Sequence, residues 1–99
     1  MPKLEYPVQI PVNFFREGDQ FVAHCPVLDL STSGGTFEQA QERFTEAVEM
    51  LFRDLIERGT LDEVLESYGW HKVGTPDPRW VPPQLVRSVE QEALIPLGA

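Results

Sequence analysis

The sequence predicts an α+β fold in which a small antiparallel sheet is covered on one face by one long helix. Apolar residues alternate with polar residues or proline over residues 6–14, and again over residues 20–25, which is typical of strands with one buried face. After Thr36 the apolar spacing changes to three and four residues, which is typical of a helix. The expected order of elements is strand, strand, strand, helix, helix, strand.

The first three strands are expected before the long helix. The strand over residues 6–14 carries two prolines on the face opposite its apolar residues, which favours an edge position because proline donates no ladder hydrogen bond. A polar link over residues 16–19 has the length of a hairpin loop, so residues 20–25 should pair with the first strand in antiparallel orientation. A short third strand is expected over residues 28–33.

The long helix is predicted to begin directly after Thr36. Thr36 and Gln39 form a capping box, in which Thr36 accepts a hydrogen bond from the Gln39 backbone N–H and Gln39 reaches back to Thr36. Gly34 and Gly35 permit the positive φ angles of a sharp turn into the helix. Gly59 is expected to end the helix, which should bury one apolar stripe. The stripe comprises Phe37, Ala40, Phe44, Ala47, Val48, Leu51, Leu55 and Ile56.

The region after the long helix is expected to be less regular. A second capping box over residues 60–63 opens a short helix that should stop at Gly69. A brief strand is predicted over residues 70–73. Four prolines over residues 74–83 predict an extended arm without regular hydrogen bonding. Partial alternation over residues 86–97 predicts a last strand.

One domain is expected over residues 1–99, with its core over residues 6–69 and a proline-rich arm and last strand over residues 70–97. Trp80 in the arm and Phe52, which lies off the helical stripe, add apolar surface to an unpaired sheet edge. Such surface favours a homo-oligomer formed through the arm. The alternative is an arm that folds back over its own helix.

The charge of the chain is strongly negative, with 16 acidic and 8 basic residues and a formal net charge of −8. The acids concentrate in the middle of the chain, which would repel a nucleic acid and attract a basic protein. Alternatively, the charge serves only solubility. The candidate partner-binding residues are Glu38, Glu42, Glu46 and Glu49 on the exposed side of the long helix, together with His24 and Trp80.

No catalytic, metal or cofactor site is expected. His24 and Cys25 are adjacent in a strand and therefore face opposite ways, which does not suit a thiolate working with a base. Cys25 is expected to be buried and His24 exposed or at an interface. His71 is too far from His24 in sequence to form a recognisable metal motif. The four glutamates would need further ligands from outside the helix to hold a cation, so a solvated face is favoured.

The sequence is typical of a soluble protein of the reducing cytoplasm. Cys25 is the only cysteine, so no disulfide can form within the chain. The amino terminus is interrupted by prolines and lacks the apolar run of a signal peptide. No apolar stretch approaches the roughly 18 residues that span a bilayer, so no membrane interaction is expected.

A family resemblance lies between residues 21 and 47, where F-V-A-H-C-P-V-L is followed by S-T-S-G-G-T and then by E-Q-A and E-A. This pattern resembles the N-terminal domain of HicB-type antitoxins, over roughly residues 8–59. Thr32, Gly34 and Thr36 take the positions of a Ser, a Gly and a Thr in the turn of that family.

Two features depart from the family pattern. Asp29 and Leu30 replace a Pro-Gly-Cys segment and are one residue shorter, and Gln39 replaces the second of two acids, of which Glu38 is kept. The resemblance implies a partial RNase H-like fold and a non-enzymatic protein that holds a small basic HicA-type mRNA-cleaving toxin by occlusion.

Two alternatives accompany the antitoxin hypothesis. Family members that bind DNA carry a helix-turn-helix or ribbon-helix-helix segment after this domain, and no such pattern follows Gly59. The chain would then be a solitary HicB-like homo-oligomeric scaffold or regulatory protein without a toxin. A more remote alternative is an RNase H-like nuclease, which needs acids on its strands, where only Asp29 qualifies.

Overall fold

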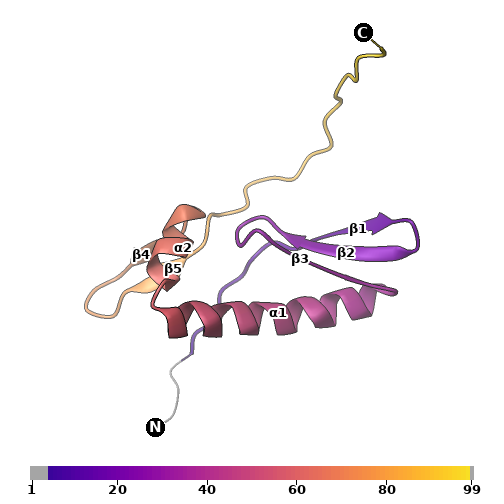
Figure 1. The fold of residues 1–99 in the computed structure, drawn as a ribbon. Coiled ribbons are helices and arrows are strands. Elements are labelled where there is room, and N and C mark those ends of the chain that lie inside the picture. Colours follow the sequence, from indigo (N-terminus) through magenta and orange to yellow (C-terminus); the bar gives the residue numbers. More distant parts are fainter. Residues whose placement is uncertain (1–4, 99) are drawn as a thin grey trace.

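A computed structural model describes residues 5–98 of the chain (Figure 1). The elements are β1 (Asn13–Glu17), β2 (Gln20–Cys25), β3 (Leu30–Gly34), α1 (Phe37–Arg58), α2 (Leu61–Ser67), β4 (His71–Val73) and β5 (Arg79–Val81). The first three strands form an antiparallel sheet in the order β1-β2-β3, and α1 packs on it. The predicted α+β class is confirmed to this extent.

The register of the sheet separates its two faces. Phe15 lies opposite Val22, and Val22 lies opposite Ser33, so these side chains share the outer face, away from α1. The inner face holds Ala23 and Cys25, which are fully buried and pack in one cluster with the helix. That cluster comprises Ala23, Cys25, Val27, Leu28, Ala40, Phe44, Leu65, Trp70 and Trp80.

The first strand is shorter than predicted and begins at Asn13. The prediction of a strand over residues 6–14 is wrong for residues 6–12, which run without strand pairing. Two prolines in this segment remove backbone donors, so alternation alone could not build a ladder there. The segment is held instead by Tyr6, whose hydroxyl accepts a 2.7 Å hydrogen bond from the backbone N–H of Trp80.

The third strand begins two residues later than predicted and reaches Gly34. Residues 26–29 form a turn, in which the N–H of Leu28 donates to the carbonyl of Cys25 at 3.4 Å. Asp29 adopts a φ of 49°, a left-handed conformation that aspartate tolerates better than most residues. The buried side chain of Leu28 therefore belongs to the turn and not to the strand.

The junction between β3 and α1 confirms the cap and corrects the role of the glycines. The Gln39 N–H donates to Thr36 Oγ1 at 3.0 Å as predicted, but the Gln39 side chain accepts from the Gly35 N–H at 2.9 Å and not from Thr36. Neither Gly34 nor Gly35 has a positive φ, so that prediction is wrong. Gly34 is required for space: a Cβ there would lie 2.8 Å from the backbone N of Ala40.

The apolar stripe of α1 is buried at Ala40, Phe44 and Leu55, half-buried between Phe44 and Leu55, and open at both ends. Phe44 and Leu55 are buried, whereas Phe37 is 41 % exposed and Ile56 62 % exposed, so these two are wrongly assigned to the core. Phe37 lies in the first turn, where its ring reaches only the edge of the sheet and packs on Phe14 with a centroid distance of 4.4 Å. Gly59 ends the helix with a φ of 69°, as predicted.

The C-terminal half differs most from expectation. Thr60 makes no side-chain cap bond, so the second capping box is wrong, although α2 itself forms. A brief strand after Gly69 is confirmed as β4. Residues 79–81 pair with β4 as β5, which contradicts an unpaired arm over residues 74–83. The last strand predicted over residues 86–97 is absent, and this segment is extended and exposed.

Two tryptophans hold the β4–β5 hairpin against the body. Trp70 Nε1 donates a 2.7 Å hydrogen bond to the carbonyl of Val27, and the Trp70 ring meets Phe52 edge to face. Trp80 is only 8 % exposed. Residues 70–81 therefore belong to the packed body, and for them the alternative of an arm that folds back over its own helix is correct. Only the chain after residue 83 forms an arm (Figure 1).

The packing of α1 is tested by replacing Phe44 with alanine. The free energy of unfolding should fall by about 3–5 kcal/mol, because the ring fills a buried site between helix and sheet. The matched control is Met50→Ala on the same helix, at a side chain that is 66 % exposed, with an expected loss of about 0.5 kcal/mol or less. Urea unfolding followed by circular dichroism measures both, and similar losses would contradict the assigned faces.

Candidate partner-binding surface

The acidic row on α1 consists of Glu38, Glu42, Glu46 and Glu49. All four side chains are exposed. At 100° per residue their mean direction lies roughly 175° around the helix from that of the buried Ala40 and Phe44. The packing of α1 on the sheet therefore turns the acidic row towards solvent.

The basic residues near the row leave it uncompensated. Arg43 donates from Nη1 to the carbonyl of Ser33 at 2.8 Å, which holds its guanidinium over β3. Arg58 forms an ion pair with Asp54 at 3.0 Å, whereas Arg53 is not within ion-pair distance of Glu49. Among residues 5–98, none of the four glutamates forms an ion pair.

An open groove lies at the C-terminal end of the acidic row. It has a volume of about 760 Å³ and contains Glu49, the last member of the row. Its lining consists of Glu5, Val48, Glu49, Phe52, Arg53, Ile56 and Glu57. The groove thus combines an apolar floor with a mainly acidic rim, and such a surface suits a partner that offers both basic and apolar side chains.

A second cavity of about 320 Å³ adjoins the groove and shares Glu5, Phe52 and Ile56 with it. Tyr6 and Trp80 line this cavity as well. Sequence reasoning missed both cavities, because they depend on residues 5–8 lying beside the end of α1. The available signal was Phe52, which falls off the helical stripe.

The predicted contact residues do not form one site. Glu49 and Trp80 line adjoining cavities, but Trp80 is buried, so it supports the wall and offers little surface to a partner. His24 is half-buried on the outer face of the sheet, between Asn13 and Ser31. The sheet and α1 separate His24 from the acidic row.

The remaining chemistry of the chain is limited. Burial raises the pKa of the Cys25 thiol above its ordinary value of 9.0, although backbone hydrogen bonds from Val27 and Leu28 oppose the shift. Cys25 is inaccessible, as predicted, and its strand neighbour His24 points to the other face. Within residues 5–98, no three His, Cys, Asp or Glu side chains lie close enough together to hold a metal ion.

The described part of the chain has no helix long and apolar enough to cross a bilayer. The class defined by the fold and this surface is a small α+β protein with an acidic helix face and an apolar groove beside it. Comparisons with family models, with curated proteins and with solved structures found no match to the chain.

The burial of Cys25 is tested by alkylation. The thiolate is the reactive form, so iodoacetamide at pH 8 should modify the native protein roughly tenfold or more slowly than the protein unfolded in guanidinium. The difference should persist at pH 9, where a cysteine with the ordinary pKa of 9.0 is half ionised. Equal rates of modification, followed by mass spectrometry, would show that the inner face of the sheet is open.

Proposed function

We propose that the chain is a HicB-like antitoxin-type binding protein that neutralises a small basic HicA-type mRNA-cleaving toxin by occlusion. The observation that carries the proposal is the exposed and uncompensated acidic row on α1. A protein that cleaves RNA must present basic residues to a polyanion. The same residues would be attracted to the acidic row, and their occupation would exclude RNA.

The fold supports this proposal through the order of its elements. Three antiparallel strands followed by α1 match the arrangement implied by the HicB resemblance, and we propose that they form a partial RNase H-like fold. The turn that carries the resemblance lies at the junction of β3 with α1, where Gly34 permits the close approach of helix to sheet. Its residues are structural, and the proposed activity is binding without catalysis.

The groove beside Glu49 gives the proposed complex an apolar centre. Protein interfaces combine a desolvated core with a polar rim, and a few buried anchors supply most of the affinity. Phe52 and Ile56 would receive an apolar anchor of the toxin, while the acidic row meets its basic surface. This division assigns affinity to the groove and the rate of association to the row.

The proposed docking is tested with the basic protein that is recovered with the tagged chain from its native cells. Replacing Glu42 and Glu46 by lysine should slow association and flatten its dependence on salt, with a smaller effect on dissociation. The control is the double change of Glu63 and Glu66 to lysine on α2, which alters the net charge equally at exposed positions off the row. Stopped-flow mixing measures both rates.

Two results would contradict the antitoxin proposal. If no basic protein is recovered, the proposal that the chain binds a toxin is contradicted. If the association rate at low salt is unchanged in the variant, the acidic row is not the docking surface. If both double variants slow association equally, the effect belongs to net charge and not to the row. Circular dichroism of each variant checks that the fold is intact.

A second candidate function is favoured by the C-terminal arm. After residue 84 the chain leaves large apolar side chains in water, among them Val86, Ile95 and Leu97, which is 97 % exposed. Exposed apolar surface of this extent marks an interaction site. A solitary HicB-like homo-oligomeric scaffold or regulatory protein without a toxin would bury the arm against another copy.

A further inference from the structure

The two edges of the sheet are not equivalent. At the β3 edge, Arg43 from α1 donates to the carbonyl of Ser33 at 2.8 Å, so a side chain already occupies part of this edge. In the described part of the chain, β1 pairs with β2 on one side and with no strand on the other. An unpaired row of backbone donors and acceptors is a template for another strand.

The first three residues of β1 do little to block such pairing. Natural edge strands are protected by proline, by inward charges or by bulges. Pro11 lies before the strand begins, and Asn13, Phe14 and Phe15 carry no charge. The charges of β1 are confined to its end, where Arg16 lies on the inner face over the Phe21 ring and Glu17 lies on the outer face. Phe15 is 55 % exposed on the outer face, where its cross-strand neighbour Val22 is half-buried. The open edge therefore coincides with exposed apolar surface.

We propose that a second copy of this chain pairs with β1 through its own β1, in antiparallel orientation about a two-fold axis at Phe15. The inference rests on the homo-oligomeric candidate function and names its interface. A two-fold axis normal to the sheet keeps equivalent residues of the two copies on the same face of the joined sheet. Only registers that place outer-face residues opposite outer-face residues, and inner opposite inner, are therefore possible.

The register centred on Phe15 is the best of these. It pairs all five residues of β1, placing Phe15 opposite Phe15, Phe14 opposite Arg16, and Asn13 opposite Glu17 of the second copy. No like charges meet. Centring on Arg16 would oppose two guanidinium groups, which destabilises a cross-strand pair. Centring on Phe14 would leave Glu17 unpaired within β1.

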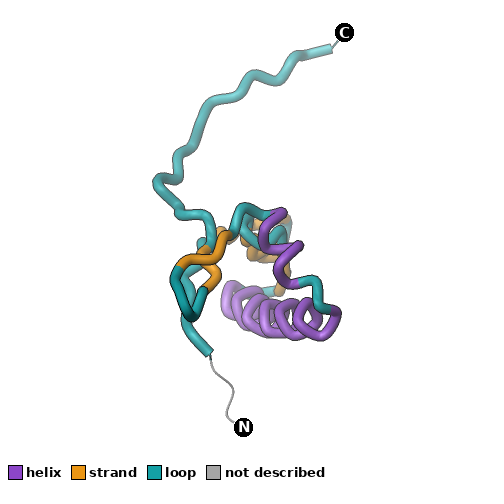
Figure 2. The backbone as a smooth tube through the Cα atoms, turned by 90° about the vertical axis from the view of Figure 1, so that its left-hand side faces the viewer, coloured by secondary structure: helices purple, strands orange, loops and turns teal. Residues whose placement is uncertain are grey.

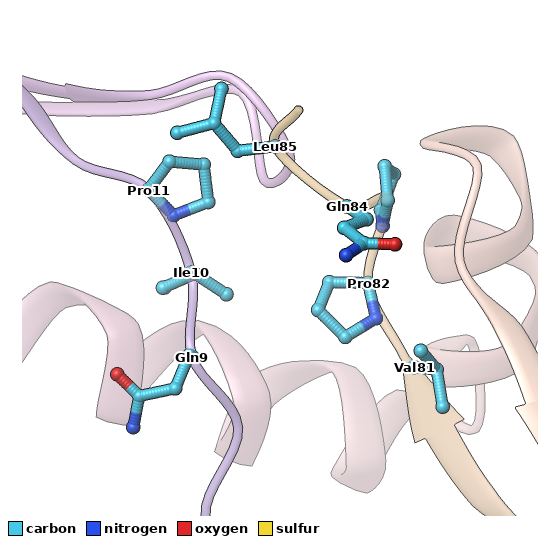
Figure 3. Close-up of a pocket in the computed structure, with 8 residues that line it drawn as sticks. Gln9, Ile10, Pro11, Val81, Pro82, Gln84 and Leu85 are labelled. Carbon is cyan, nitrogen blue, oxygen red and sulfur yellow. The ribbon is translucent and has the colours of Figure 1, made fainter. Parts of the chain in front are cut away.

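The pairing also gives the arm a surface to cover. The arm begins at a cavity of about 450 Å³ between two extended segments, where Leu85 faces Pro11 just before β1 (Figure 3). From there it leads away in the direction opposite to α1 (Figures 1 and 2). In the proposed register the start of β1 lies beside Glu17 of the second copy, so each arm emerges next to the outer face of its partner.

Cysteine cross-linking tests this register. In Phe15→Cys two thiols face each other across the axis, at Cα separations of about 4.5–5.5 Å that permit a disulfide. In the control Asn13→Cys the equivalent Cα atoms lie roughly 13 Å apart, beyond disulfide reach. The double variant Asn13→Cys with Glu17→Cys should cross-link, because Asn13 lies opposite Glu17 of the second copy. This variant keeps the Phe15 ring, so it tests the register even if that ring is needed for assembly. The native Cys25 is buried and should not interfere.

Sedimentation of the full chain is measured beside the cross-linking, so that a failure of the homo-oligomeric function can be told apart from a failure of the β1 interface alone. We expect a dimer at micromolar concentration, with efficient cross-linking of Phe15→Cys and of the double variant and little of Asn13→Cys. A monomer would overturn both the interface and the homo-oligomeric function. A dimer in which Phe15→Cys cross-links no better than Asn13→Cys would overturn the interface alone. In the single variants no disulfide can form within one chain, because the only other thiol, that of Cys25, is inaccessible.

Discussion

The structure depends on the close approach of α1 to β3. At Gly34 the strand passes so near the first turn of the helix that an added Cβ would lie 2.7 Å from the Cβ of Gln39. Thr32 donates to the carbonyl of Ala40 at 2.9 Å, and Thr36 caps the same turn. These contacts orient the helix, and its orientation buries Phe44, turns the acidic row outward and brings Arg43 to one sheet edge, leaving the other open.

A second set of contacts joins the two ends of the chain. Trp70 is hydrogen-bonded to Val27, which lies 43 residues earlier, and Trp80 to Tyr6, which lies 74 residues earlier. The Arg79 guanidinium lies 5.0 Å from the centre of the Tyr6 ring. These contacts hold the N-terminal segment beside the end of α1, and the cavities near Phe52 exist because it is held there.

The features that depend on interactions between residues close in sequence can be predicted from the sequence. The cap at Thr36 and the end of α1 at Gly59 involve residues a few positions apart, and both are as expected. Residues 6–12 form no strand although their apolar residues alternate, because the two prolines of this segment donate no ladder hydrogen bonds. The burial of Trp80 and the groove beside Glu49 depend on contacts between residues that are distant in sequence, and the periodicity of apolar residues does not predict such contacts. The close approach at Gly34 was also hidden, because a glycine placed for space and one placed for its φ angle look alike in a sequence.

The central claim, that the β3–α1 junction fixes the structure through steric necessity at Gly34, is tested most directly by comparing Gly34→Ala with Gly35→Ala. A Cβ at Gly34 meets backbone at 2.8 Å, whereas one at Gly35 meets only Gln39 Oε1, at 3.4 Å. Urea unfolding should show a loss of about 1–3 kcal/mol or more for Gly34→Ala, as for other overpacked sites, and a clearly smaller change for Gly35→Ala. Equal free energies of unfolding for the two variants would contradict the claim.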